Sequence, residues 1–246
     1  MDLGIKGRVA IVTGGSRGLG MVAAKALAQE GVHVSICGRT KSNLDETVEE
    51  LKSLGVPAIG VVADIAEPSG AQDVYNATVA GLGPVDIVVN NVGGRRGTTI
   101  TQTTEEQFKA GFEFNLYGAM RLMWLAIPGM RERHWGRIIN ISSIYGREYG
   151  GSVDYMSAKA ALIAATKHAA VELITDNVLV NSVAPGSILH PDGPWDLFIK
   201  NQTPEVGGEF IARKEPAGRF GRPWPPSGPA SSRALASTWT GGRAGL

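Results

Sequence analysis

The stretch TGGSRGLG, residues 13–20, decides which fold this chain is expected to adopt. It follows the apolar run RVAIVT at 8–13 and opens a helical pattern, and Gly14, Gly18 and Gly20 give it the spacing T-G-x-x-x-G-x-G. Glycines let a backbone turn tightly and approach a pyrophosphate, while the start of a helix offers unpaired N–H groups and a positive dipole end. The order of strand, glycine-rich turn and helix therefore predicts a nucleotide site, the alternative being a glycine-rich turn without a ligand.

Short runs rich in Val and Ile recur along the chain and predict strands. They lie at 8–13, 32–37, 57–63, 85–91, 136–142 and 177–184. The runs are nearly continuous in apolar residues, as strands buried on both faces should be.

Helical patterns separate these runs, at about 18–30, 41–54, 68–81, 104–131 and 153–174. Thr103 with Glu106, or Thr104 with Gln107, could form a capping box for the fourth helix. The alternation predicts an α/β fold with one doubly wound parallel sheet flanked by helices. Ligands of such sheets bind beyond the carboxyl ends of the strands, near the point where the strand order reverses.

Composition excludes several classes of partner. The chain has 246 residues and a formal net charge of +1, which gives no electrostatic reason to expect nucleic acid. Cys37 is the only cysteine, so neither an intrachain disulfide nor a thiolate metal cage can form, and no metal site is expected. The start of the chain lacks the pattern of a secretory signal, and no apolar run approaches the roughly 20 residues that span a bilayer. We therefore expect a cytoplasmic protein without a membrane or nucleic-acid partner.

The charge near the second strand distinguishes between two cofactors. A site that binds an unmodified ribose usually has an acid at the end of this strand. Here CGRT, residues 37–40, carries Arg39 at that place, and Arg17 lies inside the glycine-rich loop. Two guanidinium groups near the adenosine ribose favour a 2′-phosphate, and so NADP(H), with NAD(H) as the alternative.

DYMSAKAAL, residues 154–162, places Tyr155 and Lys159 four residues apart, on one face of an expected helix. A phenol has an ordinary pKa of about 10, and a neighbouring ammonium favours its phenolate. The pair is therefore suited to passing a proton to or from a carbonyl oxygen. The alternative is a packing tyrosine beside a solvent-exposed lysine.

A series of ordered motifs makes the chain resemble the short-chain dehydrogenases/reductases from about Lys6 to Pro223. Besides the loop at 13–20, they are DI at 64–65, NNVG at 90–93, the asparagine of FNLYG at 115, INISS at 139–143, Y-x-x-x-K at 155–159 and NSVAPG at 181–186. The resemblance implies a single Rossmann-like domain that interconverts a carbonyl and a secondary alcohol, most similar to the 3-oxoacyl reductases. Sugar-alcohol, steroid and other secondary alcohol dehydrogenases are alternatives, as is a nucleotide-sensing protein without enzymatic activity.

The resemblance also implies roles for four catalytic residues. Asn115 anchors a water that relays protons, Ser143 orients the substrate oxygen, Tyr155 transfers the proton and Lys159 holds the nicotinamide ribose. Ser142 stays open as the alternative to Ser143, because the family spacing from serine to tyrosine is often one residue longer.

The residues that the resemblance and the charges assign to the cofactor lie at the ends of several strands. They are Gly14, Ser16, Arg17, Gly18, Leu19, Gly20, Arg39, Thr40, Asp64, Ile65, Asn91, Val92, Gly93, Tyr155, Lys159, Pro185, Gly186 and Ile188. The family usually has alanine where Val92 stands and threonine near His190, which leaves the carboxamide contact without its usual residue.

The chain divides at residue 222. Residues 1–222 are expected to form the dehydrogenase domain, with 187–222 covering a small carbonyl or alcohol substrate. Residues 223–246 lack the helix and strand that the family has there, so we expect a disordered tail or one altered by a reading-frame change near Pro223. Translating the encoding DNA in the other frames tests that hypothesis. In the family the helices at 104–131 and 153–174 often build a dimer interface, so we expect a homodimer or homotetramer.

Overall fold

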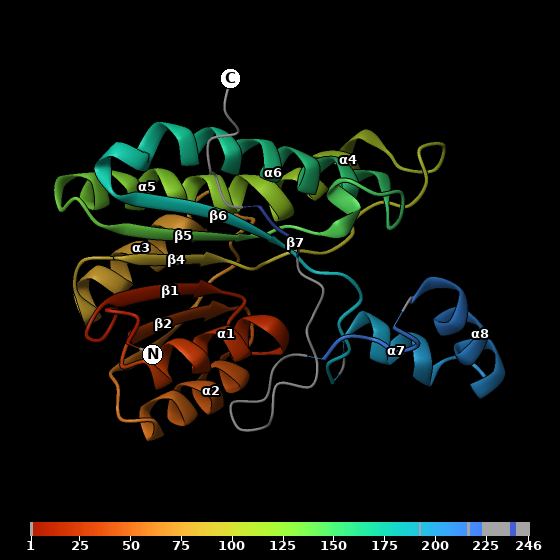
Figure 1. Cartoon of the computed structure of the whole chain (residues 1–246), viewed down its shortest axis with the longest axis horizontal. Coiled ribbons are helices and arrows are strands. Elements are labelled where there is room, and N and C mark those ends of the chain that lie inside the picture. Colours follow the sequence, from red (N-terminus) through yellow and green to blue (C-terminus); the bar gives the residue numbers. More distant parts are fainter. Residues whose placement is uncertain (1, 192, 216, 223–236, 240–246) are drawn as a thin grey trace.

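The computed structural model describes residues 2–191, 193–215, 217–222 and 237–239, which contain one seven-stranded sheet whose first six strands are parallel. The six parallel strands are β1 (Val9–Thr13), β2 (His33–Gly38), β3 (Ala58–Val62), β4 (Ile87–Asn90), β5 (Gly136–Ile141) and β6 (Val178–Ala184). They lie in the order β3-β2-β1-β4-β5-β6, so the order reverses between β1 and β4 (Figure 1). The predicted fold class is confirmed, and the reversal places the expected ligand crevice at the carboxyl ends of β1 and β4.

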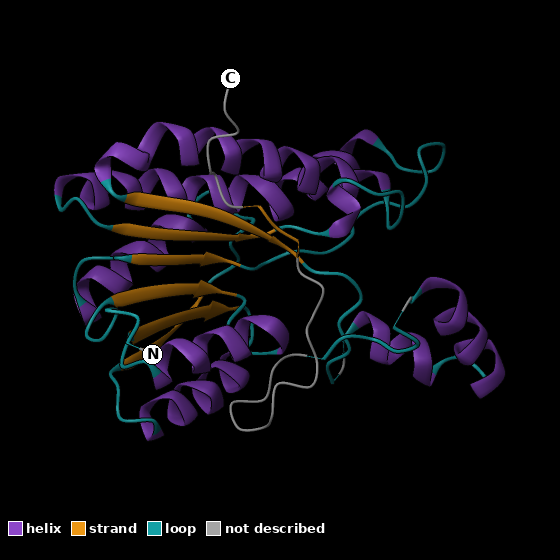
Figure 2. Ribbon diagram, viewed as in Figure 1, coloured by secondary structure: helices purple, strands orange, loops and turns teal. Residues whose placement is uncertain are grey.

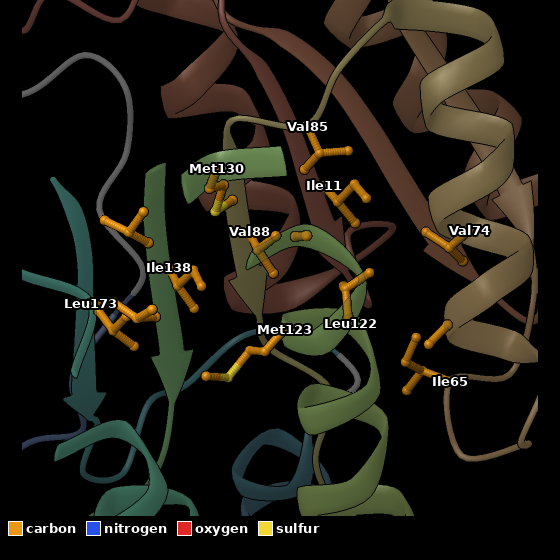
Figure 3. Close-up of a cluster of buried hydrophobic side chains, with 14 of the residues drawn as sticks. Ile11, Ile65, Val74, Val85, Val88, Leu122, Met123, Met130, Ile138 and Leu173 are labelled. Carbon is orange, nitrogen blue, oxygen red and sulfur yellow. The ribbon is translucent and has the colours of Figure 1, made fainter. Parts of the chain in front are cut away.

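Helices cover the sheet on both faces (Figure 2). They are α1 (Gly18–Gln29), α2 (Lys41–Ser53), α3 (Gly70–Leu82), α4 (Glu105–Phe112), α5 (Gly118–Glu132) and α6 (Val153–Leu173). One core cluster joins α1 and α2 to β1, β2 and β4, and the other joins α3, α5 and α6 to the opposite face. Figure 3 shows Leu122 and Met123 of α5 among strand residues such as Val88 and Ile138. No helix in the described ranges has the length and hydropathy that a bilayer crossing requires.

Continuous burial, expected for every strand, holds only in the middle of the sheet. All residues of β1 and β4 are buried, whereas β5 and β6 alternate between buried and half-buried positions. Their buried residues, such as Ile138 and Val180, face α5 and α6, while Ile139 and Ile141 lie half-buried on the face of α1 and α2. Apolar sequence alone could not show this difference, because it depends on how far the helices of one face extend across the sheet.

The long helix predicted at 104–131 is interrupted. A turn of π-helix, Glu113–Tyr117, separates α4 from α5 and places Asn115 in the interior, where it is 1% exposed. Of the two capping boxes left open, the one formed by Thr104 and Gln107 starts α4. A π-turn is often found at functional sites because the widened turn redirects a side chain. The side chain redirected here is an amide beside the loop that follows β4.

The segment after β6 forms two further helices, α7 (Pro194–Lys200) and α8 (Pro204–Lys214), which project from the body of the domain (Figure 1). A cluster of aromatic rings holds them together, with centroids 4.8 to 6.3 Å apart: Trp195, Phe198, Phe210 and Phe220. A short strand that the sequence did not predict, β7 (Ser237–Trp239), pairs antiparallel with β6. The rest of the expected atypical tail, 223–236 and 240–246, lies outside the described residues.

Candidate active site

The glycine-rich loop turns sharply between β1 and α1. Gly14 and Gly18 have φ angles of +62° and +57°, a region that a side chain disfavours. A Cβ atom on Gly20 would lie 2.5 Å from Nδ2 of Asn91 and would also meet the carbonyl group of Gly14. The amide of Asn91 in turn donates to the carbonyl oxygen of Thr13 at 3.0 Å, which fixes the loop on the end of β4. The backbone of the predicted loop therefore favours glycine at positions 14, 18 and 20.

A cleft of about 660 Å³ opens in front of this loop, at the carboxyl ends of the strands. Every residue assigned to the cofactor from the sequence lines the cleft except Gly20. Ser143, Tyr155 and Lys159 line it as well, whereas Asn115 does not. The structure thus brings most of the predicted site residues together around one space.

Positive charge gathers where β2 ends. Arg17 and Arg39 both line the cleft, and Nη1 of Arg39 lies 3.6 Å from Oδ2 of Asp64. The Arg39 side chain is 59% exposed, so this single contact leaves much of its guanidinium open to another anion. The hydroxyl of Ser16 lies beside Gly38, at the same end of the cleft.

Ser142 and Ser143 point to different surroundings, as successive strand residues do. The Ser142 hydroxyl donates to the carbonyl oxygen of Val183 at 3.1 Å and accepts from the Ser182 hydroxyl at 2.9 Å. The Ser143 hydroxyl accepts from the backbone N–H of Tyr145 at 3.2 Å, and it acts on the phenol of Tyr155 by lowering its pKa. Both serines line the cleft, but only Ser143 affects the pKa of Tyr155.

Burial controls the protonation of the tyrosine and lysine pair. It raises the pKa of Tyr155 above its ordinary value, and the hydrogen bond from Ser143 offsets part of that shift. Burial lowers the pKa of Lys159 to about 8. Nζ of Lys159 donates to the carbonyl oxygen of Ile141 at 2.8 Å and lies 5.8 Å from the ring centroid of Tyr155. Loss of solvent around the phenol has the largest effect on its pKa and raises it, where the neighbouring ammonium was expected to lower it.

Comparison with known proteins identifies the family. The family model described as short chain dehydrogenase matches residues 8–192. The chain belongs to the short-chain dehydrogenase family. This short-chain dehydrogenase is 43% identical to an uncharacterized oxidoreductase of Mycobacterium tuberculosis over 184 residues, which are 74% of this chain and 70% of that protein.

Two further relatives are reductases. The 3-oxoacyl-[acyl-carrier-protein] reductase of Thermotoga maritima is 33% identical over 221 residues, 89% of this short-chain dehydrogenase and 87% of that protein. The crystal structure of L-sorbose reductase from Gluconobacter frateurii, complexed with NADPH and L-sorbose, is 34% identical with a TM-score of 0.83, and the match covers 91% of this chain and 88% of that one.

Asn115 of this short-chain dehydrogenase fixes the loop after β4. Its Nδ2 donates to the carbonyl oxygens of Gly94 and Gly111, both at 2.8 Å, and its Oδ1 accepts from the N–H of Gly94 at 2.9 Å. A Cβ atom on Gly93 would meet both Oδ1 of Asn115 and Nζ of Lys159, at 3.1 and 2.9 Å. Both amide hydrogens of Asn115 are thus used within the protein, and only its oxygen has spare capacity for the expected water.

Sequence reasoning gave no role to Tyr145, which lies in the turn after Ser143 and lines the cleft of the dehydrogenase. Trp195 and Phe198 of α7, in the segment expected to cover the substrate, line it as well. The ring of His190 lies over Gly18 of the cradle, with Cε1 and Nε2 3.0 Å from where a Cβ atom there would be. The sequence signal for Tyr145 was its position two residues after the serine. The position of His190 depends on the path of the chain after β6.

We expect the Lys159→Met variant of this dehydrogenase to differ from the wild type in the pH dependence of its stability. Between pH about 8 and 10.5 the unfolded chain keeps a proton that folded Lys159 has released, so wild-type stability rises with pH in this window. The variant lacks this titration, and its free energy of unfolding relative to the wild type should fall by about 2 kcal/mol from pH 7 to 9.5. Urea unfolding at the two pH values measures the change. Parallel pH profiles of the two proteins would contradict it.

Proposed function

We propose that this short-chain dehydrogenase interconverts a carbonyl and a secondary alcohol with NADP(H), and that its substrate is a 3-oxoacyl thioester. The proposal depends on one observation: Ser143, Tyr155 and Lys159 line the same cleft as the glycine cradle. The similarity to the 3-oxoacyl-[acyl-carrier-protein] reductase of Thermotoga maritima supports the substrate class. The similarity to L-sorbose reductase supports a sugar ketone as the second candidate.

The residues present fit a nicotinamide dinucleotide. The cradle lacks the Cβ atoms that would fill it, and Asp64, Asn91 and Ile188, which the resemblance assigns to adenine, ribose and nicotinamide, all line the cleft. When bound, the nicotinamide supplies the hydride for carbonyl reduction or accepts it from the alcohol. The amine of Lys159 is close enough to the cleft to hold a ribose hydroxyl.

Tyr155 moves the proton in this proposal. Its raised pKa keeps the phenol protonated at neutral pH, which is the state that donates to the oxygen of a ketone as that oxygen gains negative charge. Ser143 donates to the same oxygen and holds it beside the phenol. In the direction of alcohol oxidation the phenolate is needed, and the protonated Lys159 together with a cationic oxidised nicotinamide favours it.

Activity of the purified protein tests the proposal directly. A panel containing a 3-oxoacyl thioester, a sugar ketone, a simple ketone and a steroid ketone is offered with NADPH or NADH and followed at the nicotinamide absorbance. We expect the highest kcat/KM with the thioester and NADPH. Binding of NADPH without turnover of any carbonyl would instead support a nucleotide-sensing protein.

The preference for NADPH is expected to depend on Arg39. In the Arg39→Gln variant the ratio of NADPH to NADH affinity should fall by about 10- to 100-fold, since a charged hydrogen bond contributes about 1.5–3 kcal/mol. Fluorescence titration with each nucleotide measures the ratio. The control is Arg131→Gln, at an ion pair with Asp176 outside the cleft. Loss of affinity for both nucleotides alike would show that Arg39 does not bind a 2′-phosphate.

A homodimer or homotetramer stays part of the proposal, as does a cytoplasmic location. Large apolar side chains remain exposed on the two helices expected at the interface: Trp124 of α5 is 58% exposed and Val171 of α6 is 62% exposed. Exposed apolar groups of this size on neighbouring helices are typical of surfaces that associate.

A further inference from the structure

The loop that follows β4 carries two adjacent arginines, and its backbone is fixed at three points. The hydrogen bonds join Gly94 to Asn115 at 2.9 and 2.8 Å, the N–H of Arg96 to Oδ2 of Asp154 at 2.8 Å, and the carbonyl of Thr98 to the N–H of Val153 at 3.0 Å. Asp154 is fully buried and directly precedes Tyr155. The loop is therefore held against α6, the helix that carries Tyr155. These contacts fix the backbone positions from which the two arginine side chains extend.

The two arginines have different surroundings. The guanidinium of Arg96 lies over the ring of Phe114, 4.0 Å from its centroid, in a cation–π contact. Arg95 instead lines the cleft together with Ser143, Tyr145 and Tyr155. In the part of the chain that the structure describes, no carboxylate forms an ion pair with Arg95. Its guanidinium is thus open to a ligand at the mouth of the site.

The positive charge of Arg95 affects the two tyrosines of the cleft. It lowers the pKa of both Tyr145 and Tyr155, although burial raises the pKa of each by more. Glu215, just beyond α8, acts in the opposite sense and raises the pKa of Tyr145. Glu215 does not pair with Arg95, so the positive charge beside the two phenols is not neutralised by contact.

We propose that Arg95 is a specificity-determining residue that binds an anionic oxygen group of the substrate, a phosphate or a carboxylate, at the mouth of the cleft. The inference rests on the proposed function and narrows its substrate class. A guanidinium donates two parallel hydrogen bonds to either group, which gives both affinity and orientation. The phosphate of a pantetheine arm and the carboxylate of a free oxo acid are the two sources of such a group.

Matched substrates and matched variants test the proposal. The first pair is the 3-oxobutanoyl thioester of 4′-phosphopantetheine and that of pantetheine, which lacks the phosphate. The second pair is 3-oxobutanoate and its methyl ester. In Arg95→Gln, kcat/KM for the anionic member of one pair should fall by about 10- to 100-fold, while the neutral member changes less than about threefold. Arg96→Gln is the control and should leave all four substrates within about threefold of wild type.

The outcomes separate the two sources and the two proposals. A loss confined to the phosphopantetheine thioester assigns the phosphate, and one confined to 3-oxobutanoate assigns the carboxylate. Equal losses on charged and neutral substrates, or equal losses in the two variants, would overturn the role of Arg95. If the wild type reduces none of the four substrates, the proposed reductase function is wrong, and binding alone tests the anion site. Calorimetry then measures the affinity of each variant for the phosphopantetheine thioester and for 3-oxobutanoate. Weaker binding of either ligand by Arg95→Gln than by Arg96→Gln supports the anion site, and equal binding rejects it.

Discussion

In the Tyr155→Phe variant, kcat for carbonyl reduction is expected to fall by at least about two orders of magnitude, which is within the usual contribution of general acid catalysis. The ring stays in place, so the half-buried packing and the cradle are unchanged, and the affinity for NADPH should stay within about twofold. The phenol interacts with Ser143 in the cleft, and its ring centroid lies 5.8 Å from Nζ of Lys159. Without it, the oxygen that gains charge has no proton donor of fixed position. Single-turnover measurement with saturating NADPH separates this loss from any change in binding.

Two other tyrosines serve as controls. Tyr149 is 96% exposed, and Tyr149→Phe should leave kcat unchanged. Tyr145 lines the same cleft, so Tyr145→Phe is the stricter comparison and should cost less than about tenfold, as expected for a group outside the proton transfer. If Tyr145→Phe abolishes turnover and Tyr155→Phe does not, the proton donor is misassigned. A large loss of NADPH affinity in Tyr155→Phe would show that the phenol acts mainly by binding the cofactor and not by transferring the proton.

The strands and the glycine cradle could be predicted because they depend on local sequence. Short runs of Val and Ile that alternate with helical patterns form the buried strands of a parallel sheet. The first six strands lie within a few residues of the predicted bounds. The turn at Gly14 and Gly18 needs positive φ angles that glycine permits, so the spacing of glycines in the sequence predicts the turn. The position of Lys159 relative to Tyr155 follows from one turn of helix.

What the sequence could not predict depends on contacts between distant segments. The π-turn at Glu113–Tyr117 exists where the amide of Asn115 bridges Gly94 and Gly111, and no periodicity shows it. The pKa of Tyr155 moves in the direction opposite to expectation, because burial is a tertiary property that a pair of neighbouring residues does not determine. The sequence alone does not distinguish Arg95 from Arg96, whereas in the structure the guanidinium of Arg96 lies over the ring of Phe114.

We expect the Gly20→Ala variant to lose about 10- to 100-fold in affinity for NADPH, because overpacking of this kind costs about 1–3 kcal/mol. The added methyl group would lie 2.5 Å from Nδ2 of Asn91 and 2.9 Å from the carbonyl carbon of Gly14. The second contact is with backbone, which cannot move aside as a flexible side chain can. The start of α1 must then shift away from the loop, and the N–H groups that would hold the pyrophosphate shift with it. Calorimetric titration with NADPH measures the loss.

A thermal melt of the protein without ligand distinguishes a damaged cradle from an unfolded chain. The same overpacking should lower Tm by several degrees, since about 1 kcal/mol corresponds to 2–4 °C in a domain of this size. Gly208→Ala in α8 is the control, because no atom lies within 4 Å of a Cβ there. It should keep NADPH affinity and hold or raise Tm, as alanine is the better helix former. Undiminished NADPH binding by Gly20→Ala would mean that the dinucleotide does not use this cradle, and the location of the cofactor along the ends of β1 and β4 would have to be abandoned.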